Sequence, residues 1–339
     1  MADLAETIDS LAHDTGFAGA VSVQRAGESV IGSAYGLADR AHRIPNTVDT
    51  RFGIASGVKG LTALAVVSVI GDGMLAFDTT ARSLLGRDLP LIDDAVTVEQ
   101  LLAHRSGIGD YFDEDVEGEI TDYVLPVPVH ELVDTEDYLR VLDGFPQKFA
   151  PGERFSYCNG GYVVLALLAE RASGVPFHRL VRERVAEPAG MRSTEFLRSD
   201  ELPGDAALGY LPIDGLDRTN VFHLPVRGSG DGGLYSTVGD FGRFWPALFE
   251  ERILPGDIVD ELVRRRSESE DGRGYGLGFW IPASSGEPAH PETVMLEGFD
   301  AGVSFRSWHD RRTETTATVV SNTSDGTWPI ARRLVELLA

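Results

Sequence analysis

Residues 52–70 read FGIASGVKGLTALAVVSVI, and this stretch decides how the rest of the chain is interpreted. A short apolar approach precedes a long apolar run, which predicts a buried helix that stops at Gly71-Asp72-Gly73. Positions i and i+3 of a helix lie on one face, so Ser56 and Lys59 should point into the same space. The pattern therefore predicts a hydroxyl and an amine side by side at a helix N-terminus.

Lysine is rare in this chain: 30 residues are Lys or Arg, and only Lys59 and Lys148 are lysines. Arginine keeps its proton near neutral pH, whereas a desolvated lysine can lose it. A nucleophilic serine needs a base and a site for an oxyanion, and the unpaired N–H groups of a helix N-terminus favour negative charge. The spacing of Ser56 and Lys59 thus suits nucleophilic catalysis, although a lysine that only caps or pairs on the helix has the same spacing.

A second candidate segment, PGERFSYCNGGYVVLALLAE, spans residues 151–170. The phenol of Tyr157 has an ordinary pKa of about 10, and beside a lysine it would share a proton with the amine. Asn159 offers both a donor and an acceptor to a substrate amide. The alternative is a loop tyrosine that precedes a buried helix, and the residues alone leave both readings open.

The apolar periodicity places strands near both ends of the chain and helices between them. We expect an α/β (α+β) fold in which residues 1–55 and 228–339 form a sheet lobe and residues 56–227 form a mainly helical lobe, together one structural domain. The N-terminal segment, with Leu4, Ile8, Leu11 and Ala12 on one stripe, should be an amphipathic helix. The expected strands are 17–24, 29–35, 275–281, 294–296, 302–308 and 315–321, and the expected helices include 56–70, 98–104, 160–172, 237–249 and 328–338.

The composition limits the partners. The net charge is −23, and such a surface repels nucleic acid and anionic lipid, so neither nucleic acid nor membrane is an expected partner. No apolar run reaches the ~20 residues of a membrane span, and the acidic N-terminus does not resemble a secretory signal. Cys158 is the single cysteine, which fits a reducing compartment, and we expect a cytoplasmic protein. The sequence does not indicate an oligomeric state.

Several weaker patterns do not support other chemistry. Gly228, Gly230 and Gly233 match G-x-G-x-x-G without a βαβ unit, so a tight loop is favoured over a dinucleotide site. The segment that begins at Asp113 and continues through Asp115, Glu117 and Gly118 imitates a calcium loop, but its twelfth position is Val124 instead of a glutamate. We expect a solvated acidic loop and no metal. No serine lies in a G-x-S-x-G elbow, which argues against an α/β-hydrolase.

Five segments give a more specific signal: SGVK (56–59), LLAHRSGI (101–108), PGERFSYCNGGY (151–162), GDGGLYSTVGDFGRF (230–244) and YGLGFW (275–280). In order and spacing the chain resembles the class C β-lactamase-type serine hydrolases, a group that includes esterases, D-aminopeptidases and D-Ala-D-Ala carboxypeptidases. The resemblance implies an antiparallel sheet flanked by helices, with the site beside a helical lobe. It also implies that Ser56 is the nucleophile, Lys59 its proton partner, Tyr157 the general base and acid, and Asn159 a substrate or lysine contact. In this resemblance His104 is a structural residue.

The third motif departs from the family, in which a lysine or histidine on a strand helps to hold a substrate carboxylate. The equivalent stretch here is EGFDAG (297–302), so Phe299 or, with a shift of one residue, Asp300 replaces that cation, and Ala301 and Gly302 follow. We expect these four residues to contact substrate and the oxyanion to lie between the Ser56 N–H and a backbone N–H near Ala301 or Gly302. Arg306 is the candidate for a substitute cation.

We therefore expect a serine hydrolase without a cofactor that cleaves small or medium neutral acyl esters through an acyl-enzyme on Ser56, with a small-molecule acyl compound as its partner. One alternative is a D-amino-acid amidase, aminopeptidase or β-lactamase-like amide hydrolase, because Asp300 would bind a substrate amine. Another is a non-catalytic ligand-binding relative, because the third motif is broken.

Overall fold

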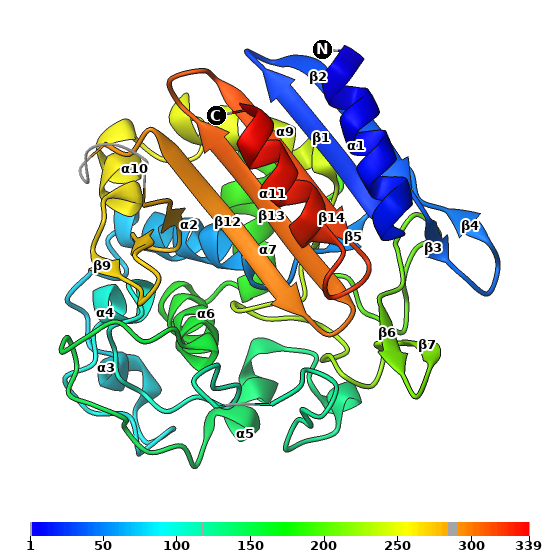
Figure 1. The fold of residues 1–339 in the computed structure, drawn as a ribbon. Helices are drawn as coiled ribbons and strands as arrows, with labels where there is room; N and C mark the ends of the chain where they lie inside the picture. Colours follow the sequence, from blue (N-terminus) through cyan, green and yellow to red (C-terminus); the bar gives the residue numbers. More distant parts are fainter. Residues whose placement is uncertain (1, 117, 284–289, 339) are drawn as a thin grey trace.

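A large antiparallel sheet drawn from both ends of the chain forms the centre of the molecule (Figure 1). The computed structural model describes residues 2–116, 118–283 and 290–338. The sheet has eight strands in the order β2-β1-β14-β13-β12-β11-β10-β9, so the N-terminal hairpin lies directly beside the last strand. These strands are β1 (Gly19–Arg25), β2 (Glu28–Tyr35), β9 (Ser267–Glu268), β10 (Gly274–Tyr275), β11 (Trp280–Ile281), β12 (Thr293–Asp300), β13 (Val303–Asp310) and β14 (Thr315–Ser321).

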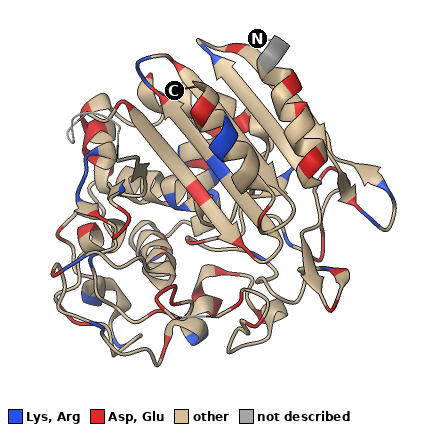
Figure 2. Cartoon of the chain, in the orientation of Figure 1, with Lys and Arg blue, Asp and Glu red and all other residues tan. Residues whose placement is uncertain are grey.

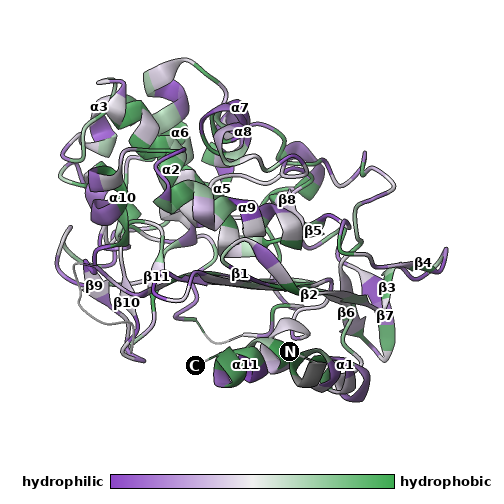
Figure 3. Ribbon diagram, turned by 90° about the horizontal axis from the view of Figure 1, so that it is seen from above, coloured by the Kyte–Doolittle hydropathy of each residue, from purple (hydrophilic) through white to green (hydrophobic). Residues whose placement is uncertain are grey.

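One face of the sheet is covered by the two terminal helices, α1 (Ala2–Thr15) and α11 (Thr327–Leu338), which lie together on the same side in Figure 3. Ile8 of α1 and Leu334 of α11 are fully buried in the same apolar cluster as Val21 and Val319 of the sheet. The apolar stripe predicted for the N-terminal helix therefore packs on the sheet, as an amphipathic helix must to remove that stripe from water.

The other face is covered by α2 (Val58–Gly71) and α9 (Val238–Phe249), behind which the remaining helices gather (Figure 3). In α9, Thr237 caps the helix by accepting the N–H of Asp240, and Trp245 donates to Ser307 of β13 at 2.8 Å. The other helical segments are η1 (Ala55–Gly57), α3 (Ala81–Leu85), α4 (Val98–Leu102), η2 (Val129–Glu131), η3 (Thr135–Tyr138), α5 (Leu139–Leu142), α6 (Asn159–Ser173), α7 (Phe177–Val181), η4 (Arg182–Ala186), α8 (Glu187–Ala189) and α10 (Gly256–Val263).

The sheet built from both termini and the helices around it confirm the expected fold class. One expected strand was wrong, and several short strands were not expected. Residues 275–281 form two short strands, β10 and β11, because the chain turns at Gly278 with a φ of 94°. The segment expected to be mostly helical contains a hairpin of β6 (Tyr210–Ile213) and β7 (Leu216–Thr219), and small two-stranded pairs are also formed by β3 (Leu37–Asp39) with β4 (Ile44–Pro45) and by β5 (Phe52–Gly53) with β8 (Tyr235–Ser236).

Charged side chains are spread over the loops and the outer faces of the helices (Figure 2). Among the described residues, no helix combines the length and the apolar character that crossing a membrane would require. Strands β12 and β13 carry few charged residues: Glu297 of β12 pairs with Arg306 of β13, and each strand ends in an aspartate, Asp300 or Asp310.

Candidate active site

Ser56 lies in a tight 3₁₀ turn, η1, immediately before the long buried helix α2. The residue before it, Ala55, has a φ of 45°, in the left-handed region that alanine rarely occupies. The approach is fixed because Phe52 and Gly53 pair with β8 and the Ile54 N–H donates to Leu234 at 3.0 Å. These contacts of β5, β8 and Ile54 thus fix Ser56 just before the N-terminus of α2.

Lys59 is buried beneath Ser56, with 1 % of its surface exposed. Its ammonium donates to Ser56 Oγ at 2.8 Å, to Asn159 Oδ1 at 2.9 Å and to the carbonyl oxygen of Asp231 at 2.9 Å. Burial lowers the pKa of Lys59, and the negative charges of Asp231 and Glu114 offset part of that decrease. The structure therefore brings together the hydroxyl and the amine, and it places the amine where its neutral form is favoured more than in water.

Tyr157 is held between two rings beside this pair. Its ring stacks on Trp280 at a centroid distance of 5.9 Å and packs against His104 at 4.2 Å, while Lys59 Nζ lies 4.9 Å from the ring centroid. Burial raises the pKa of Tyr157 well above its ordinary value, and the Ser56 hydroxyl acts against that increase. Tyr157 thus borders the same hollow as Ser56 and lies beside the buried Lys59, although it comes from a distant part of the chain.

His104 fixes the backbone of the same segment. Its Nδ1 accepts the N–H of Cys158 at 3.0 Å, and its ring lies among those of Tyr157, Tyr162 and Tyr275. Burial lowers the pKa of His104 well below its ordinary value, so the ring is neutral and its other nitrogen carries the proton. These contacts describe a residue that positions the loop before α6.

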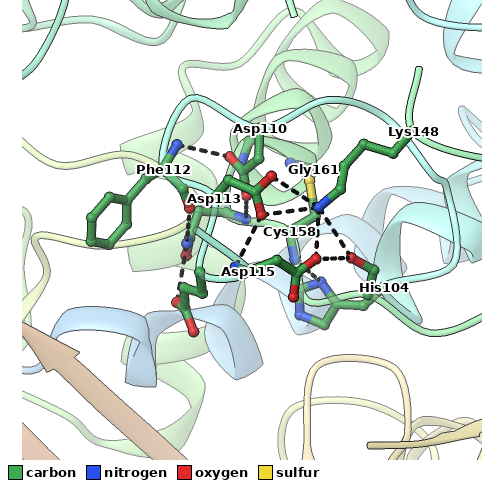
Figure 4. A network of polar contacts seen from close by, with 12 residues as sticks. His104, Asp110, Phe112, Asp113, Asp115, Lys148, Cys158 and Gly161 are labelled. Carbon is green, nitrogen blue, oxygen red and sulfur yellow. Dashed lines mark hydrogen bonds and ion pairs between the residues drawn. The ribbon is translucent and has the colours of Figure 1, made fainter. Parts of the chain in front are cut away.

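The N-terminus of α6 is capped from two directions. Cys158 Sγ accepts the N–H of Gly161 at 3.3 Å, and the carboxylate of Asp110 accepts the N–H groups of Asn159 at 2.5 Å and Gly160 at 2.8 Å. These anchors can be followed in Figure 4. Free N–H groups at a helix start need such acceptors, so the thiol and Asp110 fix the position from which Asn159 projects.

Asn159 is oriented by its own partners. Its Nδ2 donates to the carbonyl oxygen of Phe112 at 3.0 Å and to Glu114 at 3.1 Å, which leaves Oδ1 to accept from Lys59. The loop that carries Phe112 and Glu114 is in turn tied down by Lys148, whose ammonium lies between Asp113 and Asp115 at 2.9 Å and 2.8 Å (Figure 4). The carboxylates of Asp113 and Asp115, which belong to the calcium-loop pattern, therefore bind Lys148. Glu117, also part of that pattern, lies outside the described residues.

The strand β12 passes directly over the Ser56 turn. A Cβ added to Gly298 would lie 2.2 Å from the Ile54 carbonyl oxygen and 3.0 Å from the backbone nitrogens of Ser56 and Gly57. Only a glycine permits this approach. The next residue, Phe299, is 43 % exposed and borders the cavity together with Asp300. Burial raises the pKa of the Asp300 carboxyl to about 7.

Ala301 and Gly302 lie differently from what the sequence led us to expect. Both are buried, the Ala301 N–H donates to Asp300 Oδ1 at 2.8 Å, and the Gly302 N–H donates to Ser324 at 2.9 Å. Neither borders the cavity that contains Ser56. The expectation that one of these N–H groups faces an oxyanion was wrong, because the hairpin turn and the Ser324 hydroxyl use them.

Arg306 does not supply a cation to the site. Its guanidinium pairs with Glu297, at 2.7 Å for the Nε contact, and lies over the ring of Trp328 in α11. A second arginine, Arg273, also reaches Glu297 at 3.2 Å and lies over the ring of Trp280. Glu297 is therefore neutralised by arginines from neighbouring strands and turns.

Two hollows meet at Ser56, and we call them the small and the large hollow. The small hollow is bordered by Tyr111, Tyr123, Leu224, Asn159, Asp231 and Asp300. The large hollow is bordered by Tyr157, Trp280, Arg154, Arg273 and Glu270. Ser56 and Phe299 border both, so Phe299 forms a ridge between them.

Sequence reasoning missed three residues that shape this site. The Asp231 carbonyl holds Lys59, Asp110 anchors the start of α6, and Gly298 admits β12 to the Ser56 turn. The G-x-G-x-x-G pattern did mark the loop that carries Asp231, but only as a tight loop. For Asp110 no local signal exists, since its partners lie 49 and 50 residues further along the chain.

Comparisons with known proteins agree with this architecture. The family model described as Beta-lactamase matches residues 4–339. Esterase EstB of Burkholderia gladioli is 30% identical over 95% of this chain and 90% of its own length, and a D-aminopeptidase of Brucella anthropi is 28% identical over 94% of this chain and 58% of its own length. The crystal structure of a penicillin binding protein from Bacillus halodurans superposes with a TM-score of 0.91 at 34% identity, covering 97% of this chain and 99% of that one.

Proposed function

The chain belongs to the beta-lactamase family of serine hydrolases, and from that premise we propose that it cleaves small or medium neutral acyl esters through an acyl-enzyme on Ser56. The observation that carries the proposal is the 2.8 Å hydrogen bond between Lys59 and Ser56 in a buried setting that lowers the pKa of the lysine. A neutral amine at that distance is a base in contact with the proton it must remove.

In this mechanism Ser56 gives its proton to the Lys59–Tyr157 pair as its oxygen attacks the ester carbonyl. Tyr157 then protonates the leaving alcohol oxygen, and the carbon–oxygen bond of the ester breaks. A water molecule that loses its proton to the same pair attacks the acyl-enzyme, which releases the acid and restores the Ser56 hydroxyl. The contacts of Lys59 with the Ser56 hydroxyl and with the ring of Tyr157 support this sequence of steps, and no cofactor takes part.

The oxyanion would be bound by the backbone N–H groups of Ser56 and Phe299. Asp300 and Val303 close a two-residue hairpin turn, so they exchange hydrogen bonds across β12 and β13. In an antiparallel pair the residue before a hydrogen-bonded one, here Phe299, directs its N–H away from the partner strand β13. Gly298 holds that edge within reach of the Ser56 nitrogen. Removing one such donor typically costs ~3–4 kcal/mol of transition-state stabilisation.

The charges around the site favour a neutral substrate. Among the described residues that border the small hollow, two are carboxylates, Asp231 and Asp300, and none is lysine or arginine. All three N–H donors of Lys59 already have acceptors, so it offers no free donor to a substrate carboxylate. An anionic substrate such as a β-lactam would therefore meet no lysine or arginine on this lining, whereas a neutral ester needs none. The similarity to an esterase supports the same choice.

The direct test uses p-nitrophenyl acetate and a fluorophosphonate probe on the wild type and on Ser56→Ala. We expect the wild type to release p-nitrophenol and to be labelled, and the variant to do neither. An unlabelled and inactive wild type would instead favour the non-catalytic ligand-binding relative. Hydrolysis that survives in Ser56→Ala would show that another group is the nucleophile.

A second candidate is the hydrolysis of amides or esters of amino acids, because Asp300 borders the small hollow beside Asp231 and would attract an ammonium group. The similarity to a D-aminopeptidase supports this alternative. The comparison is turnover of a D-amino-acid amide against that of a neutral ester in the wild type and in Asp300→Asn. If the substitution leaves amide turnover unchanged, the amine-binding role of Asp300 is removed.

A further inference from the structure

We propose that the two hollows at Ser56 divide the substrate, so that the small hollow receives the acyl group and the large hollow receives the leaving alcohol. The inference rests on the proposed hydrolase function and assigns a direction to it. It names Phe299 as the residue that separates the two parts, and it places acyl selectivity and alcohol selectivity on different residues.

The first step is the position of Tyr157. This phenol borders the large hollow and not the small one, and its ring is fixed between His104 and Trp280. These two ring contacts hold the phenol on the side of the large hollow. The group that protonates the alcohol oxygen must lie within hydrogen-bond reach of it, so the carbon–oxygen bond that breaks must point into the large hollow.

The second step is the geometry of the attacked carbon. When Ser56 Oγ bonds to the carbonyl carbon, that carbon carries four groups: the serine oxygen, the oxyanion, the alcohol oxygen and the acyl carbon. The oxyanion is held between Ser56 and the ridge at Phe299, so the other two groups diverge on either side of that ridge. If the alcohol leaves on the Tyr157 side, the acyl carbon must enter the small hollow beside Asn159.

The linings differ in a way that makes the division measurable. The small hollow is walled by Tyr111, Phe112, Leu125, Leu224 and Pro225, with its two carboxylates among them. Leu224 and Pro225 also border a further recess on the side of Tyr138 and Tyr235. The large hollow has charged residues of both signs along its border, among them Arg154, Glu270 and Arg273, and Trp280 forms an aromatic wall. The selectivity for acyl length should therefore depend on Leu224, and the selectivity for alcohol size on the side chains that border the large hollow with Trp280.

The experiment uses two ester series and two filling variants. One series varies the acyl chain from acetate to hexanoate with p-nitrophenol constant, and the other varies the alcohol from methyl to naphthyl with acetate constant. In Leu224→Trp we expect the hexanoate-to-acetate ratio of kcat/KM to fall about tenfold, as for a loss of one or two methylene contacts, with the alcohol ratio unchanged. In Glu270→Trp, the matched change in the large hollow, we expect the opposite pattern.

A structural readout does not depend on how well these variants fold. The wild type is inactivated with the neutral diester ethyl p-nitrophenyl hexylphosphonate, from which Ser56 displaces p-nitrophenoxide. Its phosphorus then takes the place of the attacked carbon, and its hexyl chain takes the place of the acyl group. We expect the chain beside Leu224. A chain beside Trp280, or kinetic profiles exchanged between the two variants, would overturn the orientation while leaving Ser56-dependent hydrolysis intact; the absence of any turnover and labelling would overturn both ideas.

Discussion

Replacing Gly298 by alanine tests whether the approach of β12 to the Ser56 turn is as close as the structure indicates. The added Cβ would lie 2.2 Å from the Ile54 carbonyl oxygen, where ordinary contact begins at 3.4 Å. The neighbouring atoms belong to backbone, which cannot rotate aside, so the strand or the turn must move by about 1 Å. Overpacking of this kind typically costs ~1–3 kcal/mol of folding stability.

The effect on activity should exceed the effect on stability. The displaced atoms include the nitrogen of Ser56 and the strand edge that carries the Phe299 N–H, and a misplacement of about 1 Å can cost ~100-fold in rate. We therefore expect kcat/KM for p-nitrophenyl acetate to fall about 100-fold in protein that circular dichroism shows to be folded. Thermal unfolding measures the accompanying loss of stability.

Gly32→Ala is the matched control, because it makes the same change within a strand of the same sheet. Its added Cβ would meet nothing closer than Ser29 Oγ at 3.9 Å, so neither activity nor stability should fall. Activity of Gly298→Ala within threefold of the wild type would refute the reasoning, since it would mean that β12 does not press on the nucleophile turn.

Three other substitutions test the lysine, the buried carboxyl group and the thiol. Lys59→Arg keeps the charge but not the basicity, so kcat/KM should fall at least ~100-fold; retention of most activity would remove the lysine from proton transfer. Burial raises the pKa of Asp300 to about 7, so as pH rises the unfolded chain releases this proton before the folded protein does, and the wild type loses stability. Asp300→Asn lacks the proton, so its thermal stability relative to the wild type should increase from about pH 4 to about pH 7 and stay constant above that. A stability difference that does not vary with pH would contradict this. Cys158→Ser should keep full activity and at least wild-type stability, because a serine oxygen caps α6 as the sulfur does; a large loss of activity would implicate the thiol in chemistry.

The local signals in the sequence were sufficient for the two helices that follow Ser56 and Tyr157 in the chain. The apolar run after Ser56 gave α2, and Ser173-Gly174 marked the end of α6, where Gly174 adopts the left-handed conformation. The hairpin of β6 and β7 was missed although Asp214-Gly215 is a strong turn signal, with φ values of 53° and 74°. Its strands have only four residues each, which is too short for a clear alternation.

The third motif shows what the sequence cannot supply. Substitution of the usual cation drew attention to Phe299 and Asp300, both of which border the cavity, but it also suggested Ala301 and Gly302, which do not. The distinction depends on which residue of β12 meets the Ser56 turn, and that residue is Gly298. A glycine has no side chain whose chemistry would indicate such a contact in the sequence, so the contact is seen only once β12 and the Ser56 turn are placed together in the structure.

The three acceptors around Lys59 constrain where its electrons point once a proton is lost. A neutral amine has two hydrogens and one lone pair for three neighbours. The Asp231 carbonyl has no hydrogen to offer, and the Asn159 amide presents its oxygen because its nitrogen is committed to Phe112 and Glu114. The hydroxyl of Ser56 is the one neighbour of the three that can reverse from acceptor to donor. When Lys59 loses a proton, its lone pair therefore points at the Ser56 hydroxyl, and none of its three hydrogen-bond partners has to move.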